Sequence, residues 1–128
     1  MYRYKVKTVD KVVDGDTVDV TIDLGFDILH KIRVRLYGIN TPESRTRDLE
    51  EKKRGLAAKD RLYELISSAF MDDHFLILET KEKGKYGRYL GNLIRKAVVV
   101  KDGEEVELNL NRQLVTEGHA VDYFGGKR

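Results

Sequence analysis

Arg35 and Glu43 lie eight residues apart in the segment RLYGINTPE. An arginine can donate to two phosphate oxygens at once, and a carboxylate fixed just after a proline can position a water molecule and accept its proton. The segment therefore indicates phosphoryl-transfer chemistry. A strand-end ion pair without a catalytic role would have the same spacing, so these two residues alone leave both interpretations open.

Asp16 shares the parity of Val18, Val20 and Ile22, which alternate with polar residues and mark the buried face of a strand. A carboxylate in line with buried positions needs a partner, because an unpaired buried charge is costly. A metal ion is one such partner. Loop backbone is another, since aspartates in turns commonly hydrogen-bond to it. An EF-hand is excluded, because Asp19 stands where its loop needs glycine.

A third segment, KYGR at residues 85–88, places Arg88 beside a tyrosine and a glycine turn. By itself it is typical of a loop. Together with VDGDTV at residues 13–18 and the segment from Arg35 to Glu43, it resembles the staphylococcal nuclease (thermonuclease) family in order and spacing. The resemblance extends from about Lys5 to Tyr123.

The resemblance implies an α+β protein, a β-barrel with α-helices, of the staphylococcal-nuclease-like OB-fold. This is a five-stranded Greek-key barrel, here one domain over residues 1–128. It implies that Glu43 acts as general base and that Arg35 and Arg88 stabilise charge on the phosphoryl oxygens. The same match implies a nucleotide-binding pair and a set of metal ligands: Lys85 and Tyr86 for the nucleotide, and Asp16, Asn40 and the carbonyl of Thr41 for Ca²⁺.

The implied reaction is calcium-assisted attack of water on a phosphodiester of DNA or RNA, leaving 3′-phosphates. Little sequence specificity is expected, because contacts to phosphate and sugar do not distinguish bases. Asn40 departs from the family, whose best-known members have aspartate there. The site loses a negative charge, so calcium should bind more weakly or Mg²⁺ or Mn²⁺ should replace it. The alternative function is a nucleic-acid-binding module with little or no catalysis.

The elements that must position these residues begin with three strands, from Tyr4–Val13 through Val18–Ile22 to Ile32–Leu36, and Pro42 closes this region. A capping box of Asp48 and Glu51 predicts a helix from near Leu49, with Gly55 expected to fray its first turns. Its predicted apolar stripe is Ala58, Leu62, Leu65, Ile66, Ala69 and Phe70.

Two more strands are expected at Phe75–Glu79 and Tyr89–Val100, the second ending at a turn over residues 101–103. Asn109 should cap a short helix, Leu110–Glu117, that Gly118 ends. Without the resemblance, this pattern also fits other α+β arrangements.

The composition adds exclusions. The 128 residues include no cysteine, which rules out disulfides, thiolate zinc sites and a cysteine nucleophile. No apolar run is long enough to span a membrane, and no export signal is visible, so we expect an intracellular monomer, with a phage-encoded one also considered. Bases clustered between Ser44 and Arg61 would attract a polyanion or form a solvated face. His30, His74 and His119 are expected at the surface, isolated from the motifs.

Overall fold

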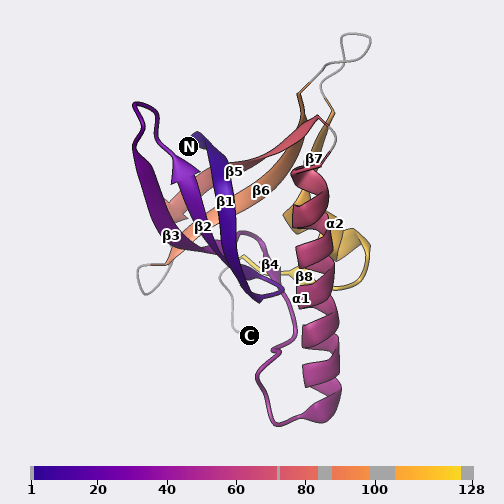
Figure 1. Ribbon diagram of the computed structural model, residues 1–128. Helices are drawn as coiled ribbons and strands as arrows, with labels where there is room; N and C mark the ends of the chain where they lie inside the picture. The colour runs from indigo at the N-terminus through magenta and orange to yellow at the C-terminus, as the bar shows by residue number, and fades with distance from the viewer. Residues whose placement is uncertain (1, 72, 84–87, 99–105, 125–128) are drawn as a thin grey trace.

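The computed structural model describes residues 2–71, 73–83, 88–98 and 106–124 (Figure 1). Strands come first, a long helix interrupts them, and a short helix follows the last strand of the main sheet. The elements are β1 (Arg3–Asp14), β2 (Thr17–Asp23), β3 (Leu29–Leu36), β4 (Ile39–Asn40), α1 (Leu49–Ala69), β5 (His74–Lys83), β6 (Tyr89–Ala97), β7 (Glu107–Asn109), α2 (Leu110–Thr116) and β8 (Val121–Asp122).

Five strands close into a mixed barrel in the order β1-β2-β3-β6-β5, with β5 returning to β1. β3 and β6 pair in parallel, whereas the other pairs of the ring are antiparallel. β7 extends the sheet beside β6, and β4 pairs with β8. The barrel and its two helices confirm the predicted OB-fold. Residues 99–105, including the expected turn and Val100, lie outside the described residues.

The predicted apolar face of β2 and β3 is confirmed, although Thr21, predicted on the polar face of β2, is also buried. Val18, Val20 and Ile22 are buried on one face of β2, and Val34 and Leu36 continue that core from β3. Three register shifts between β1 and β2 are sites of irregular pairing. Such bulges bend a strand and increase its twist, which helps a small sheet to close.

Helix α1 begins where the sequence predicts, at Leu49, and Asp48 accepts hydrogen bonds from the backbone of Glu50 and Glu51. Two details differ. Phe70, placed on the apolar stripe, is the C-cap and is exposed. Gly55 does not fray the helix: it is buried, because α1 approaches another part of the chain there.

Helix α2 packs against α1 and β6 and contains Asn111, which is fully buried. The Asn111 amide nitrogen donates to the carbonyls of Tyr37 and Gly91 and to Asn92 Oδ1 at 3.0–3.1 Å. Its side-chain oxygen accepts from Leu93 N. One amide thus joins α2, β6 and the segment after β3. Asn109 caps α2 as predicted, accepting from Arg112 N.

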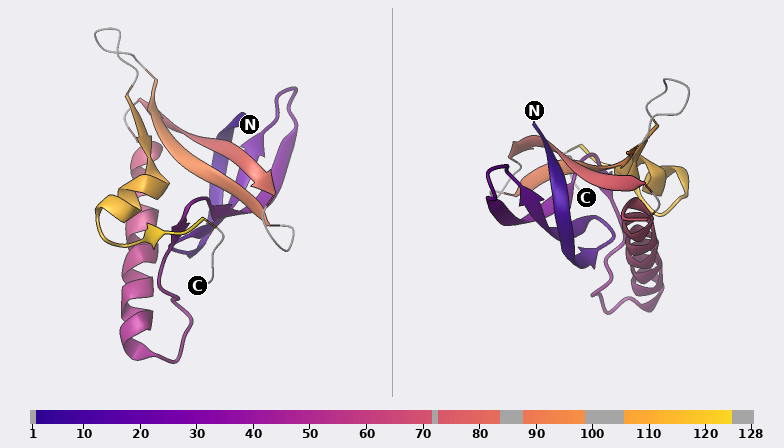
Figure 2. Two further views of the ribbon diagram at one scale, coloured as in Figure 1. Left: turned by 180° about the vertical axis from the view of Figure 1, so that it is seen from behind. Right: turned by 45° about the horizontal axis from the view of Figure 1, so that its top comes forward.

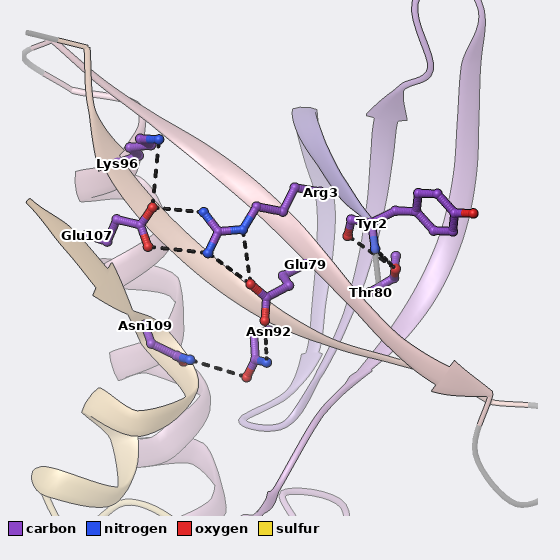
Figure 3. A network of polar contacts seen from close by, with 8 residues as sticks. All are labelled: Tyr2, Arg3, Glu79, Thr80, Asn92, Lys96, Glu107 and Asn109. Carbon is purple, nitrogen blue, oxygen red and sulfur yellow. Dashed lines mark hydrogen bonds and ion pairs between the residues drawn. The ribbon is translucent and has the colours of Figure 1, made fainter. Parts of the chain in front are cut away.

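A second polar network connects β1 to β5 and β7 (Figure 3). Arg3 contacts Glu79 on β5 and Glu107 on β7, at 2.9 and 2.8 Å. The two carboxylates raise the pKa of Arg3, chiefly through the hydrogen bond that Arg3 donates to Glu107. The network lies on the outside of the sheet formed by β1, β5, β6 and β7. None of the described helices is long and apolar enough to cross a membrane.

Candidate active site

Arg35 lies at the end of β3, opposite Thr17 at the start of β2. This pairing brings its guanidinium beside Asp16, which immediately precedes β2. Arg35 Nη1 is 3.3 Å from Asp16 Oδ2, and Arg35 Nη2 donates to Asn40 Oδ1 at 2.9 Å. The side chain of Arg35 is only 14% exposed. Three residues of the sequence motifs are therefore in direct contact.

Asp16 is 7% exposed, as its parity predicts, and its charge is compensated. Besides Arg35, its carboxylate accepts from Thr41 N and Thr17 Oγ1, each at 3.1 Å. Leu36 N donates to its main-chain carbonyl at 2.8 Å. Asp16 therefore accepts a hydrogen bond from loop backbone, which is one of the two partners predicted for it. It also lies close to Asn40 and Thr41, the other two residues predicted to bind a metal ion.

The oxygen atoms around Asp16 are of the chemical types that bind a hard cation. One guanidinium reaches both Asp16 Oδ2 and Asn40 Oδ1, so these oxygens face a common positive charge. Hard divalent cations prefer such carboxylate, amide and carbonyl oxygens. Among the residues that the structure describes, no three His, Asp or Glu side chains come together as a metal site. A cation here would depend on one carboxylate, one amide and the Thr41 carbonyl.

An open cleft of about 660 Å³ lies beside this cluster and brings Arg35 and Arg88 together. Lysine or arginine supplies five of its lining residues and aspartate one. The lining comprises Val13, Asp14, Thr17, His30, Lys31, Ile32, Arg33, Arg35, Arg45, Arg88 and Tyr89. Such an excess of positive charge suits an anionic ligand.

Glu43 is exposed on the segment between β4 and α1, two residues after Thr41, and is not among the residues that line the cleft. Its backbone N–H donates to Glu51 Oε1 at 3.5 Å. The adjacent Ser44 is buried and donates its hydroxyl to Asp14 Oδ1.

Gly55 explains how α1 fits against this segment. A Cβ at Gly55 would lie 2.5 Å from the carbonyl carbon of Glu43 and 2.7 Å from Ser44 N. The helix therefore packs directly on the backbone that carries the candidate base, which the sequence pattern did not reveal.

Lys85 and Tyr86 lie outside the described residues, so their placement beside a nucleotide stays a prediction. Sequence reasoning missed Arg45, Lys31, Arg33 and Tyr89 as cleft residues. The sequence did contain one indication of two of them: Lys31, Arg33 and Arg35 alternate along β3, so their side chains share its outward face. His30 is exposed as predicted, but its predicted isolation from the motifs is wrong, because it lines the same cleft.

The charges near the cleft interact with one another. Arg33 donates two hydrogen bonds to Asp19, at 2.7 and 3.1 Å. This pairing raises the pKa of Arg33 and lowers that of Asp19. Part of the positive charge along β3 is therefore balanced, whereas exposed Arg45 and Arg88 add charge at the cleft.

Two comparisons with known proteins bear on the family of this chain. The chain is 27% identical over 118 residues to Protein ParB of Escherichia coli, an alignment that covers 91% of this chain and 57% of ParB. The chain thus spans little more than half the length of that curated relative. The model of the staphylococcal nuclease homologue family matches residues 33–128, which include Arg35, Asn40, Glu43 and Arg88. The chain therefore belongs to the family of staphylococcal nuclease homologues.

Proposed function

We propose that this protein is a metal-dependent phosphodiesterase that hydrolyses DNA or RNA with little sequence specificity. The observation that carries the proposal is the cluster of Arg35, Asp16 and Asn40 at a cleft that Arg88 also lines. Two arginines at one cleft can bind a phosphodiester and stabilise the charge that develops on its oxygens. Family membership supports the same class of reaction.

Glu43 acts as the general base in this proposal. It accepts a proton from water as the water oxygen bonds to phosphorus, and the bond from phosphorus to the 5′-oxygen breaks. The 5′-oxygen leaves and is protonated by solvent, so the product carries a 3′-phosphate. Arg35 and Arg88 donate to the phosphoryl oxygens, and loss of one such donor typically costs about 3 kcal/mol of transition-state stabilisation. Lys85 and Tyr86 are proposed to contact the nucleotide.

Asp16, Asn40 and the Thr41 carbonyl would hold the cation, which would polarise the phosphate when bound. The metal is proposed to be calcium, with magnesium or manganese as alternatives, because Asn40 supplies no charge. The paired charges of Arg35 and Asp16 orient the guanidinium at the edge of the cleft even before a ligand binds. Little of the Arg35 side chain is exposed, so its rotamer freedom is limited.

A specific observation also favours the second candidate, a nucleic-acid-binding module with weak or no catalysis. Asn40 replaces an expected carboxylate, and its oxygen already accepts from Arg35. A site with one carboxylate would bind cations weakly, while the basic cleft would still attract nucleic acid.

The test is cleavage of single-stranded DNA, duplex DNA and RNA by the purified protein in EDTA, calcium, magnesium and manganese. We expect cleavage with at least one metal, and a loss of about 100-fold or more in kcat for Glu43→Gln and for Arg88→Ala. Arg112→Ala is a matched control, because Arg112 is exposed and pairs with Asp122 outside the cleft lining. Binding without cleavage in every metal would favour the binding module. Cleavage that survives both substitutions would refute the assigned roles.

A further inference from the structure

The hairpin between β2 and β3 carries four large apolar side chains that the core does not use. Leu24, Phe26, Ile28 and Leu29, here called the apolar tip, are 42%, 99%, 54% and 53% exposed. Single exposed apolar residues are common, but a contiguous group often marks a binding surface. The hairpin projects from the barrel on the side away from α1 (Figures 1 and 2).

The apolar tip is held in a defined conformation. Leu24 N donates to Ile28 O at 2.9 Å, and Ile28 N donates to Gly25 O at 3.0 Å. Gly25, Phe26 and Asp27 have φ values of 82°, 53° and 61°. The left-handed region is unfavourable for a bulky residue such as Phe26, and Asn-Gly is the usual choice for two central turn residues of this kind. A fully exposed phenyl ring at a strained position is therefore unexplained by folding.

A row of cations connects the apolar tip to the cleft. Lys31, Arg33 and Arg35 share the outward face of β3 with Leu29, and alternate residues on a strand lie about 6.7 Å apart. Lys31 and Arg33 also line the cleft. The row thus leads from the proposed catalytic arginine directly to the hairpin.

Among the described residues, two further carboxylates face this row besides Asp16, which pairs with Arg35. Asp19 pairs with Arg33, and Asp10, which accepts from Thr21 Oγ1 at 2.7 Å, interacts with Lys31. Because these acids balance part of the positive charge, electrostatic attraction alone gives only modest binding along β3. A nucleic acid held here would gain much of its affinity from contacts with the apolar tip.

We propose that the apolar tip stacks on unpaired bases of a nucleic-acid strand whose backbone leaves the cleft over Arg33 and Lys31. Basic grooves with exposed aromatic rings bind single strands in this way, because every base offers a face for stacking. This proposal rests on the proposed function, because the strand would occupy the same cleft. The preferred substrate would be a single strand long enough to reach from the catalytic cluster to the apolar tip.

Two other occupants are disfavoured. Entry into a bilayer would desolvate Asp23, which precedes the apolar tip, and Asp27, which lies within it. A stable interface with a second copy takes about 20–30 residues from each partner, many more than a hairpin tip provides.

The test uses Phe26→Trp, because the chain contains no tryptophan and the new indole would report on the apolar tip alone. We expect quenching of its fluorescence when a single-stranded 12-mer is added in EDTA, which prevents metal-dependent cleavage. The same titration is repeated in calcium, where the additional substitution Glu43→Gln removes the proposed general base and so prevents cleavage. Tyr63→Trp, on exposed α1 surface, is the matched control and should not be quenched.

A second measurement compares affinities without a new fluorophore. Phe26→Ala should bind the labelled 12-mer between about 5- and 150-fold more weakly, the range expected for one stacked base. Leu56→Ala, an exposed residue of α1, should bind as the wild type does.

The proposal is overturned if Phe26→Trp is not quenched, or if Phe26→Ala binds the 12-mer as tightly as Leu56→Ala does. A blue shift with phosphatidylserine vesicles in place of quenching by DNA would assign the apolar tip to a membrane. A blue shift that grows with protein concentration alone would assign it to self-association. None of these readouts needs cleavage, so a quenched but inactive protein would refute only the proposed function. Cleavage without quenching would refute only the stacking proposal.

Discussion

Arg35 contacts Asp16 and Asn40, so the side chain expected to bind phosphate also neutralises the carboxylate expected to bind a cation. A guanidinium and a divalent cation repel each other at such short range. Cation affinity at Asp16 therefore depends on how much negative charge the neighbouring side chains supply. Asn40 supplies only a dipole, so in the proposed site it would be the residue that most limits metal binding.

Asn40→Asp should tighten calcium binding, because a second carboxylate would offset the charge of Arg35 and coordinate the cation directly. We expect the dissociation constant to fall by about tenfold or more, measured by titration calorimetry without substrate. Asn92→Asp, which also adds a carboxylate but lies in the network of Asn109 and Asn111, serves as control. An unchanged calcium titration for Asn40→Asp would show that Asn40 is not a ligand.

The family resemblance named most of the site residues, whereas the residue pattern alone predicted only the burial of Asp16, from strand parity. Asp16 is buried because it continues the alternation of Val18 and Val20, a local signal. Its contact with Arg35 depends on the register between β2 and β3, and its bond to Thr41 N joins residues 25 apart. Turn geometry and tertiary packing decide such contacts, and a periodic pattern does not contain them.

Among the elements, α1 includes one prediction from local sequence that is confirmed and one that is wrong. The cap at Asp48 is confirmed, because capping involves only the first turn of the helix. Glu51, however, accepts from Glu43 N rather than from the cap residue, so half of the expected capping box serves the neighbouring segment. The prediction for Gly55 was wrong for the same reason. Helix propensity disfavours glycine, but packing against the Glu43 backbone requires it.

Gly55→Ala should displace the segment that carries Glu43, because the added methyl group would collide with the backbone of Glu43 and Ser44. Overpacking of this kind costs about 1–3 kcal/mol of stability. We expect kcat to fall at least tenfold, since the proposed base moves while Arg35 on β3 and Arg88 before β6 stay in place. Cleavage kinetics are measured where urea titration shows the variant to be folded.

Ala57→Gly is the matched control for this experiment. It exchanges the same two residue types at an exposed position of α1 and should cost about 1 kcal/mol through helix propensity. Because no backbone segment is displaced, its cleavage should remain that of the wild type. Equal kcat values for the two variants would show that Gly55 does not position Glu43.

For the whole molecule, the family resemblance predicted the barrel, whereas the pattern of strands and helices also fitted other α+β arrangements. Barrel closure requires β3 and β6 to pair in parallel across more than fifty residues of chain. Buried Asn111 reinforces that closure by bonding Tyr37, which follows β3, and Gly91 on β6. In the sequence, Asn111 is one polar residue in a short helix, so its central position could be recognised only from the fold.

Stability should also depend on pH through the contact between the two helices. Arg61 on α1 donates to both carboxylate oxygens of Glu117 after α2, at 2.5 and 3.0 Å, and lowers the pKa of Glu117 from 4.5 to about 2. A carboxylate whose pKa is lowered by folding stabilises the native state above its unfolded pKa. This contribution, about 1 kcal/mol for a partly exposed pair, should be lost as the pH falls from about 4.5 to about 2.

Glu117→Gln isolates this contribution, because the amide keeps the shape of the side chain but has no charge to lose. The free energy of unfolding, from urea titrations between pH 7 and pH 2, should differ from that of the wild type near neutrality and converge with it at the acid end. Glu64→Gln is the matched control: Glu64 also contacts Arg61, at 3.2 Å, but its side chain is 64% exposed, so screening by water should leave this ion pair only a small contribution to the free energy of unfolding. A difference between Glu117→Gln and the wild type that stays constant down to pH 2 would contradict the assignment, because a contribution from the Glu117 charge must vanish once that carboxylate is protonated in both states.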